Sequence, residues 1–183
     1  ARVYGDFSRG IQGVSEKAVG RWIAARGARD RVVISTKGAH PPWDDMQRPR
    51  LDRQSILRDM TDSLEALGVE SVDLYYLHRD DQGRPVGDIL ETLNGLIESG
   101  RAKLVGASNW TKARIDEANR YAKAHGLAGF SVNQPQWSLA HQHLVADKTL
   151  VQMDRDMYAM HRRTGLACMP YSSQAKGFFI KLF

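Results

Sequence analysis

Two apolar runs of the chain end in side chains that can exchange protons. The run VVISTKG, residues 32–38, carries Lys37 near its end, and the run VDLYYLH, residues 72–78, ends on His78. β-branched and aromatic residues of this kind fit a buried strand. A titratable side chain at the end of each of two such strands is therefore a candidate for proton-transfer or charge-stabilising chemistry.

Further polar and aromatic groups follow the later strands. Ser108 and Asn109 come after the third apolar run, Gln134 ends the fourth, and Tyr171 follows the fifth. Any single polar residue at a strand end is also explained as an ordinary surface or turn residue, and Asn109 and Gln134 keep that alternative. Five successive strand ends in the same register favour one shared site.

The predicted elements that position these groups are helices and strands in regular alternation. Apolar residues spaced by three and four, with capping residues before them and glycines after them, predict helices at 15–26, 53–67, 87–99, 111–125 and 148–164. In the first two helices we expect Ser15 and Asp52 as the capping residues. Short apolar runs between the helices predict strands at 31–37, 72–78, 102–107, 130–134 and 166–170.

Such alternation predicts an α/β fold with a parallel sheet covered by helices. The doubly wound sheet usually carries a Gly-rich phosphate turn after its first strand, and neither G-x-G-x-x-G nor G-x-x-x-x-G-K-[ST] occurs in this sequence. In an eight-stranded barrel, catalytic residues lie at the carboxyl ends of several strands. We therefore expect residues 1–183 to form a single partial (β/α)8 TIM barrel domain, with about five full units and a strand stub at 1–3.

Composition excludes several classes of protein. The 183 residues are 42% hydrophobic and 26% charged, as in globular domains, and the net charge of +5 is scattered among acids without a basic block, which argues against nucleic-acid binding. No run approaches the length of a membrane span, no signal peptide is evident, and Cys168 is the single cysteine. We expect a cytoplasmic protein. The pair His141 and His143 resembles metal ligands, but it lies in a polar loop without acidic neighbours, so no metal site is predicted.

Short segments, taken in order, resemble the aldo-keto reductase family. The matching segments are ARVYG at residues 1–5, VVISTK, VDLYYLH, GRAKLVGASN, VNQPQWSL and PYSSQAKGFF. No single segment is decisive, but the ordered set is specific and runs from Ala1 to about Gly177. The resemblance implies a (β/α)8 barrel that reduces aldehydes and ketones to alcohols with NADPH.

The resemblance also implies catalytic roles. It makes Tyr4 the general acid, Lys37 the active-site lysine and His78 the active-site histidine. An ammonium at ~4 Å stabilises a phenolate by about 4 kcal/mol at an effective dielectric constant of about 20, so Lys37 would favour proton release from Tyr4. His78 would donate a hydrogen bond that orients the carbonyl group. Because no amino acid donates hydride, a nicotinamide cofactor is required.

A second group of residues is implied to bind that cofactor. Ser108, Asn109 and Gln134 would hold the carboxamide of the nicotinamide, and Tyr171, with Ser172 beside it, would stack on the ring. The implied partner is a small carbonyl compound.

The sequence departs from the family pattern at both ends. The family's catalytic aspartate falls just before Ala1, and its phosphate-binding segment would follow the last residue. The sequence therefore indicates an internal piece of a reductase that we expect to turn over little by itself. Two alternatives remain: a non-catalytic binding subunit like the potassium-channel β subunits of the same family, and a metal-dependent barrel hydrolase.

Overall fold

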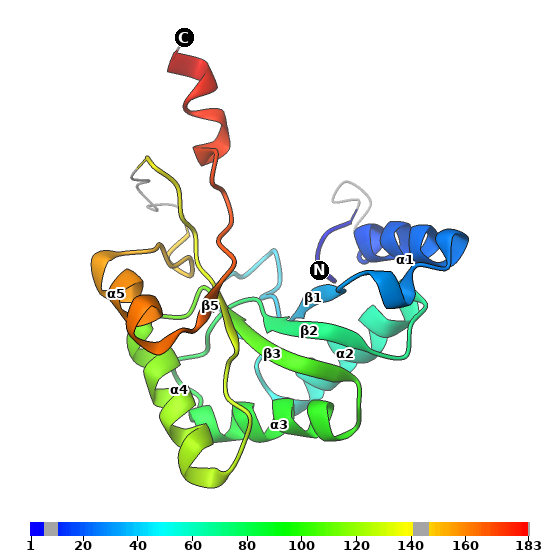
Figure 1. The fold of residues 1–183 in the computed structure, drawn as a ribbon, viewed down its shortest axis with the longest axis horizontal. Helices are drawn as coiled ribbons and strands as arrows, with labels where there is room; N and C mark the ends of the chain where they lie inside the picture. The colour runs from blue at the N-terminus through cyan, green and yellow to red at the C-terminus, as the bar shows by residue number, and fades with distance from the viewer. Residues whose placement is uncertain (6–10, 141–146, 183) are drawn as a thin grey trace.

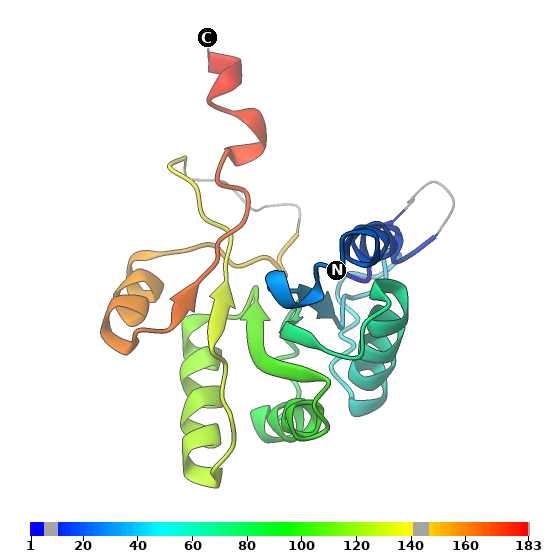
Figure 2. The same cartoon turned by 45° about the vertical axis from the view of Figure 1, so that its right-hand side comes forward.

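The computed structural model describes residues 1–5, 11–140 and 147–182 of the chain. These residues form a parallel sheet of β1 (Ser35–Gly38), β2 (Val72–Leu77), β3 (Ala102–Ser108), β4 (Val132–Gln134) and β5 (Ala167–Cys168). The helices that alternate with the strands are α1 (Val14–Arg26), α2 (Arg53–Leu67), α3 (Val86–Glu98), α4 (Lys112–His125) and α5 (Arg155–Thr164). Figures 1 and 2 show these helices along the outer side of the curved sheet. None of the described helices is long and apolar enough to cross a membrane.

Strand order decides between the two architectures that the sequence allowed. The strands lie in the order β1-β2-β3-β4-β5, and each pairs in parallel with the next. A doubly wound sheet reverses its order at a switch point, whereas a barrel adds each strand beside the previous one. The prediction of an incomplete (β/α)8 barrel is confirmed.

The two faces of the sheet have different neighbours. On β2, Tyr75 and Leu77 are fully buried in the main core, together with apolar side chains of α2, α3 and α4. Leu74 and Tyr76 point the other way and form a small second cluster with Val132 of β4. This alternation is the pattern of a barrel wall, with one side under the helices and the other toward the barrel interior.

Helix α2 begins and ends at the residues that the sequence predicts. The side chain of Asp52 accepts a hydrogen bond from the backbone N–H of Ser55 at 2.8 Å, which satisfies one unpaired donor of the first turn. Gly68 ends the helix with φ at 65°, the left-handed conformation that glycine adopts without strain. Ile56 and Met60 on its inner face are completely buried.

The predicted cap of α1 and the predicted start of α5 are wrong. Helix α1 begins at Val14 after Gly13, so Ser15 lies inside the helix and is not its cap. Helix α5 begins at Arg155, not at residue 148, because Asp154 caps it by accepting from the N–H of Met157 at 2.7 Å.

The residues before α5 are extended because they pair with a distant segment. The N–H of Gln136 donates to Val151, and the N–H of Met153 donates to Gln136. These hydrogen bonds join residues 151–153 to the chain that follows β4, and they replace the helical bonds that the apolar spacing predicted. Tertiary pairing of this kind overrides local propensity.

The outer strands are shorter than predicted. Residues 29–31 form a 3-10 turn, and the N–H of Ile34 donates to the side chain of Asp73, so regular pairing of β1 starts only at Ser35. Residues 1–3 form no strand, although the N–H of Arg2 bonds to the carbonyl of Lys37 at 3.2 Å.

Strand β5 covers only Ala167–Cys168 of the predicted 166–170. After it, the chain forms two short 3-10 helices, Ala175–Gly177 and Ile180–Leu182, in a segment that projects away from the sheet in Figure 1. His141 and His143, the pair weighed as metal ligands, lie outside the described residues.

Candidate active site

His78 lies directly after β2 at the carboxyl end of the sheet. Its backbone N–H donates to the carbonyl of Gly38 at 3.0 Å, which continues the pairing of β2 with β1 for one more residue. The side chain is only 5% exposed. Burial lowers the pKa of His78 well below its ordinary range, and the nearby cations Arg79 and Lys37 act in the same direction. The imidazole is therefore neutral at physiological pH.

The neutral ring of His78 carries its proton on one particular nitrogen. Its Nδ1 is buried and has no hydrogen-bond partner among the described residues. A buried N–H without an acceptor is more costly than a buried lone pair, so the proton resides on Nε2. The structure thus presents an uncharged N–H donor at the carboxyl end of the sheet, which is what orientation of a carbonyl oxygen requires.

Lys37 lies on the neighbouring strand, paired in register with Tyr76 of β2. Its ammonium group stands 5.3 Å from the centroid of the Tyr76 ring. Burial lowers the pKa of Lys37 from that of a free lysine. No carboxylate of the described residues lies within ion-pair distance of Lys37.

Tyr4 lies in the segment before α1 and packs against His78. The two ring centroids are 5.8 Å apart and the rings meet edge to face at 78°. Tyr4 is 44% exposed, in contrast to the buried His78. The carboxyl end of the sheet therefore brings together the tyrosine and the histidine that the sequence selected, with the lysine on the next strand.

Asn109 connects the ends of several elements. Its Nδ2 donates to the carbonyl of His78 and to Oγ of Ser108, both at 3.2 Å. Its Oδ1 accepts from the hydroxyl of Tyr171 at 2.6 Å and from the N–H of Val151 at 3.1 Å. It is 3% exposed, and φ is 61°, a conformation that asparagine tolerates better than most residues.

The amide of Asn109 is thus fully engaged with the protein itself. Any ligand amide that Asn109 bound would have to replace one of these four hydrogen bonds. The role of Asn109 in cofactor binding stays a prediction, while its role in tying three strand ends together is visible in the structure.

The other predicted cofactor residues lie at the same end. Ser108 ends β3 and donates from Oγ to the carbonyl of Gln134 at 2.9 Å. The side-chain amide of Gln134 has no hydrogen bond to any described residue, so it is free to pair with a ligand amide. Tyr171 and Ser172 follow β5, and both side chains are half-buried. Burial raises the pKa of Tyr171 to about 12, so its hydroxyl stays protonated.

These residues fit the carboxamide and ring of a nicotinamide. Gln134 supplies an unpaired amide, and the half-buried Tyr171 supplies an aromatic face that is oriented by its bond to Asn109. The buried hydroxyl of Ser108 already donates to the carbonyl of Gln134 and accepts from Asn109, so it supports these groups from behind. Among the described residues there is no group of three or more His, Cys, Asp or Glu side chains that could hold a metal ion.

Sequence reasoning missed two residues at this site. His40, three residues after Lys37, places its ring 4.6 Å from that of His78. Arg79 donates to the carbonyl of His78 at 2.8 Å and to Oγ1 of Thr149 at 2.9 Å, so it ties β2 to the segment before α5. Both residues are polar and lie close to the end of a strand, which is a signal that the sequence does contain. Several residues share this property, and no local pattern shows which of them turns toward the site.

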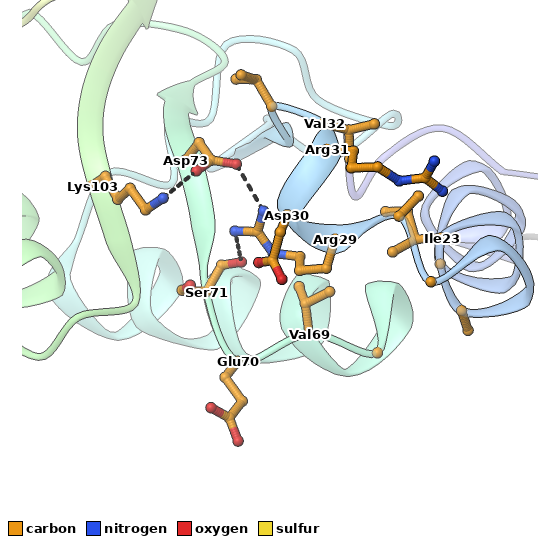
Figure 3. Close-up of a pocket in the computed structure, with 16 residues that line it drawn as sticks. Ile23, Arg29, Asp30, Arg31, Val32, Val69, Glu70, Ser71, Asp73 and Lys103 are labelled. Carbon is orange, nitrogen blue, oxygen red and sulfur yellow. Dashed lines mark hydrogen bonds and ion pairs between the residues drawn. The ribbon is translucent and has the colours of Figure 1, made fainter.

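Two of the hollows that the described residues form lie at opposite ends of the strands. One of about 320 Å³ adjoins the site, and its walls include Lys37, His40 and Trp43. A larger one of about 970 Å³ lies at the opposite, amino end of the strands, where Asp73 pairs with Arg29 and Lys103 (Figure 3). In barrels the amino end serves stability and the carboxyl end serves catalysis, so we place the functional site beside His78 and not in the larger hollow.

Comparison with known proteins agrees with this geometry. A profile of the Aldo/keto reductase family matches residues 1–182. The chain therefore belongs to the aldo/keto reductase family, a class of oxidoreductases. This membership does not favour the metal-dependent hydrolase considered above.

The sequence identity of the chain to individual relatives is below 30%. The chain is 28% identical to norsolorinic acid reductase B of Dothistroma septosporum over 95% of this chain and 44% of the relative. It is 29% identical to aldo-keto reductase ausK of Emericella nidulans over 90% of this chain and 41% of the relative. It is 27% identical to the putative aryl-alcohol dehydrogenase AAD14 of Saccharomyces cerevisiae over 90% of this chain and 43% of the relative. The chain spans less than half the length of these three relatives.

Proposed function

We propose that the protein containing this chain reduces aldehydes or ketones to alcohols with NADPH as the hydride donor. Family membership supports an oxidoreductase that acts on carbonyl groups. The observation that carries the finer proposal is the contact between a partly exposed tyrosine, Tyr4, and a buried, neutral histidine, His78. Lys37 lies on the strand beside them.

Each side chain has a separate task in this reaction. The nicotinamide supplies a hydride to the carbonyl carbon when it is bound. Tyr4 donates its hydroxyl proton to the carbonyl oxygen, so the products are an alcohol and the oxidised cofactor once Tyr4 has recovered a proton from water. Nε2–H of His78 donates a hydrogen bond to the same oxygen and fixes its direction, and the charge of Lys37 stabilises the phenolate that Tyr4 leaves behind.

The cofactor would lie across the ends of β3, β4 and β5. Gln134 would bind the carboxamide, and Tyr171, beside Ser172, would pack on the ring. Ser108 would bind the carboxamide only by giving up its bond to the carbonyl of Gln134. Asn109 would reach the carboxamide only by exchanging one of its internal bonds, so we assign it first to the support of Tyr171 and His78. The preference for NADPH over NADH is part of the proposal and is tested with both cofactors.

The names of the relatives guide the choice of substrate for the test. They include reductases of norsolorinic acid and an aryl-alcohol dehydrogenase. Trp43, which is 56% exposed, lies against His40 at the edge of the site and offers an aromatic surface to a ring-bearing substrate. A substituted benzaldehyde is therefore the first substrate to use.

The decisive experiment compares two tyrosine variants of the full-length protein. Tyr4→Phe should lower kcat for aldehyde reduction by about two or more orders of magnitude, because the general acid is lost. Tyr121→Phe on α4 is the matched control, since it removes only a hydroxyl bonded to Glu91 at the surface. NADPH oxidation, followed by absorbance, measures both.

Two results would count against the proposal. An unchanged rate in Tyr4→Phe would remove Tyr4 from the mechanism. Tight binding of NADPH with no turnover of any aldehyde or ketone in the wild-type protein would favour the alternative, a non-catalytic binding subunit of the same family.

A further inference from the structure

His40 occupies a place against His78 for which the proposed mechanism has so far no use. It lies in the loop between β1 and α2, and it is 6% exposed. Its ring meets the ring of His78 at 76° with centroids 4.6 Å apart, and it meets Trp43 on a second contact at 4.7 Å. His40 thus stands between the candidate catalytic histidine and the aromatic edge of the site.

The orientation of His78 needs a support of this kind. A catalytic histidine is usually held by a hydrogen bond to its second ring nitrogen. Nδ1 of His78 has no such partner among the described residues. Packing must therefore hold the ring, and the ring contacts that the structure shows for His78 are those with His40 and Tyr4.

The loop that carries His40 is itself fixed from α2. Ala39 has φ at 57°, a left-handed conformation that costs a residue other than glycine of the order of 1 kcal/mol or more. Its N–H donates at 2.7 Å to Oδ2 of Asp59, a carboxylate of α2 that is 5% exposed. Arg50 binds both oxygens of Asp59, at 2.8 and 3.2 Å, and donates to the carbonyl of His40 at 3.1 Å. We call Arg50 and Asp59 the loop clamp.

His40 contributes shape and no charge. Its Nδ1 lies 2.5 Å from the carbonyl of Pro41, which can only accept, so Nδ1 carries a proton. Burial lowers the pKa of His40, which leaves Nε2 unprotonated. The charged groups that face the ring, Arg79, Asp147 and Arg50, belong to three different segments and include both signs.

We infer that His40 is a positioning residue for the proposed carbonyl reduction: its ring, fixed by the loop clamp, holds the ring of His78 so that Nε2–H faces the substrate. The inference rests on the proposed function. If the ring of His78 turned, its N–H would no longer point at the carbonyl oxygen. A misplacement of a catalytic group by about 1 Å can lower the rate ~10²-fold.

The first test replaces the ring of His40 in the full-length protein. His40→Ala should lower kcat for benzaldehyde reduction by about tenfold, because His78 can turn into the vacated space. The dissociation constant of NADPH, measured by fluorescence, should not change. His40→Phe, which refills the space without charge, should retain kcat within about threefold of the wild type. Equal losses in the two variants, or a wild-type kcat in His40→Ala, would overturn the inference.

A spectroscopic readout separates positioning from general loss of stability. The chain has six histidines, so the ring nitrogens of His78 are assigned by ¹⁵N NMR as the signals that vanish in His78→Gln. In His40→Ala the ring of His78 gains contact with water, and its pKa should rise toward the ordinary value. The charged and aromatic groups near His78 are Tyr4, Lys37, His40 and Arg79. Of these four, the variant changes only His40. An unshifted His78 titration would contradict the inference.

The loop clamp has a matched control at the other end of the sheet. Asp73 also accepts a backbone N–H, that of Ile34, at 2.8 Å. Its carboxylate binds Arg29 at 3.1 Å and Lys103 at 2.7 Å (Figure 3). Asp59→Asn and Asp73→Asn should both lower Tm. Only Asp59→Asn should lower kcat and shift the titration of His78, and equal effects of the two variants on kcat would overturn the role of the clamp.

The Tyr4→Phe variant distinguishes the two levels of failure. If Tyr4→Phe is inactive but His40→Ala has wild-type kcat, only the present inference fails. If Tyr4→Phe remains active, the proposed mechanism fails, and the His78 spectra of His40→Ala still decide whether His40 controls the state of that ring.

Discussion

Two side chains at the carboxyl end of the sheet are held in states that are unfavourable for a folded protein. His78 keeps a buried ring nitrogen that no described residue pairs with, and Lys37 keeps an amine whose pKa is lowered by burial. Each arrangement costs free energy of folding, since desolvated polar groups are stable only when they are paired. Locally unfavourable arrangements of this kind are common at functional sites. Here they occur at two of the residues to which the family resemblance assigns a catalytic role.

The neutral state of His78 has a measurable effect on stability. The unfolded chain takes up a proton on this histidine near pH 6.5, whereas in the folded protein the pKa is well below that value. The unfolded state therefore binds more protons below pH 6.5, and the free energy of unfolding falls as the pH drops, by up to about 1.4 kcal/mol per pH unit from this group. His78→Phe should remove that part of the slope.

Urea titrations between about pH 7 and pH 5 measure the difference. His125→Phe, at an exposed position of α4, is the control for the exchange of a histidine for a phenylalanine. The same slope in His78→Phe and in the wild type would mean that the pKa of His78 is alike in the folded and unfolded chain, which would contradict the effect of burial on this ring.

At the scale of elements, local signals predicted helices better than they predicted the segments between them. Helix α2 was predicted residue for residue because Asp52, the apolar spacing and Gly68 all act within one stretch of chain. The start of α5 was missed because residues 151–153 pair with Gln136, a contact that no local pattern encodes. The same limit applies to the site. Strand ends pointed to Lys37 and His78, but which loop residue would turn inward, as His40 does, depends on a clamp from another helix.

The close packing of β1 against its neighbours gives a prediction for Gly38, the last residue of this strand. A Cβ atom at Gly38 would lie 1.9 Å from the hydroxyl of Tyr75 and 2.9 Å from Cβ of Asp59. Gly38→Ala should therefore destabilise the protein by about 1–3 kcal/mol, as overpacking of a core does. It should also lower kcat, because it pushes on the loop clamp.

Gly95, in the middle of α3, provides the contrast. An added Cβ there meets nothing within 4 Å. Gly95→Ala should stabilise the protein by about 0.5–1 kcal/mol, since alanine favours the helix. Thermal unfolding of the two variants tests both statements, and a stable Gly38→Ala variant with normal activity would show that the packing around β1 is looser than the structure indicates.

At the scale of the whole molecule, the sheet has two open edges in the described residues. On the outer side of β1 the structure shows one backbone bond, from Arg2 to Lys37, and β5 is only two residues long. Apolar side chains remain uncovered: Val33 is 81% exposed, Leu104 of β3 is 48% exposed and Met169 after β5 is 47% exposed. A closed barrel removes such edges and fills its interior with side chains, so these surfaces are of the kind that further strands cover.

The 183-residue chain expressed alone should therefore self-associate. Unpaired strand edges and an uncovered apolar face favour pairing between copies, and they leave the packing beside β1 and β5 loose. Sedimentation should show dimers or larger species, thermal unfolding should be broad, and NADPH oxidation with benzaldehyde should be much slower than in the full-length protein. Leu104→Lys, which places a charge on the uncovered face, should reduce the association, whereas Lys103→Gln on the same strand should not. A monomer with a sharp transition and full turnover would show that these five strands with their helices form a complete catalytic unit.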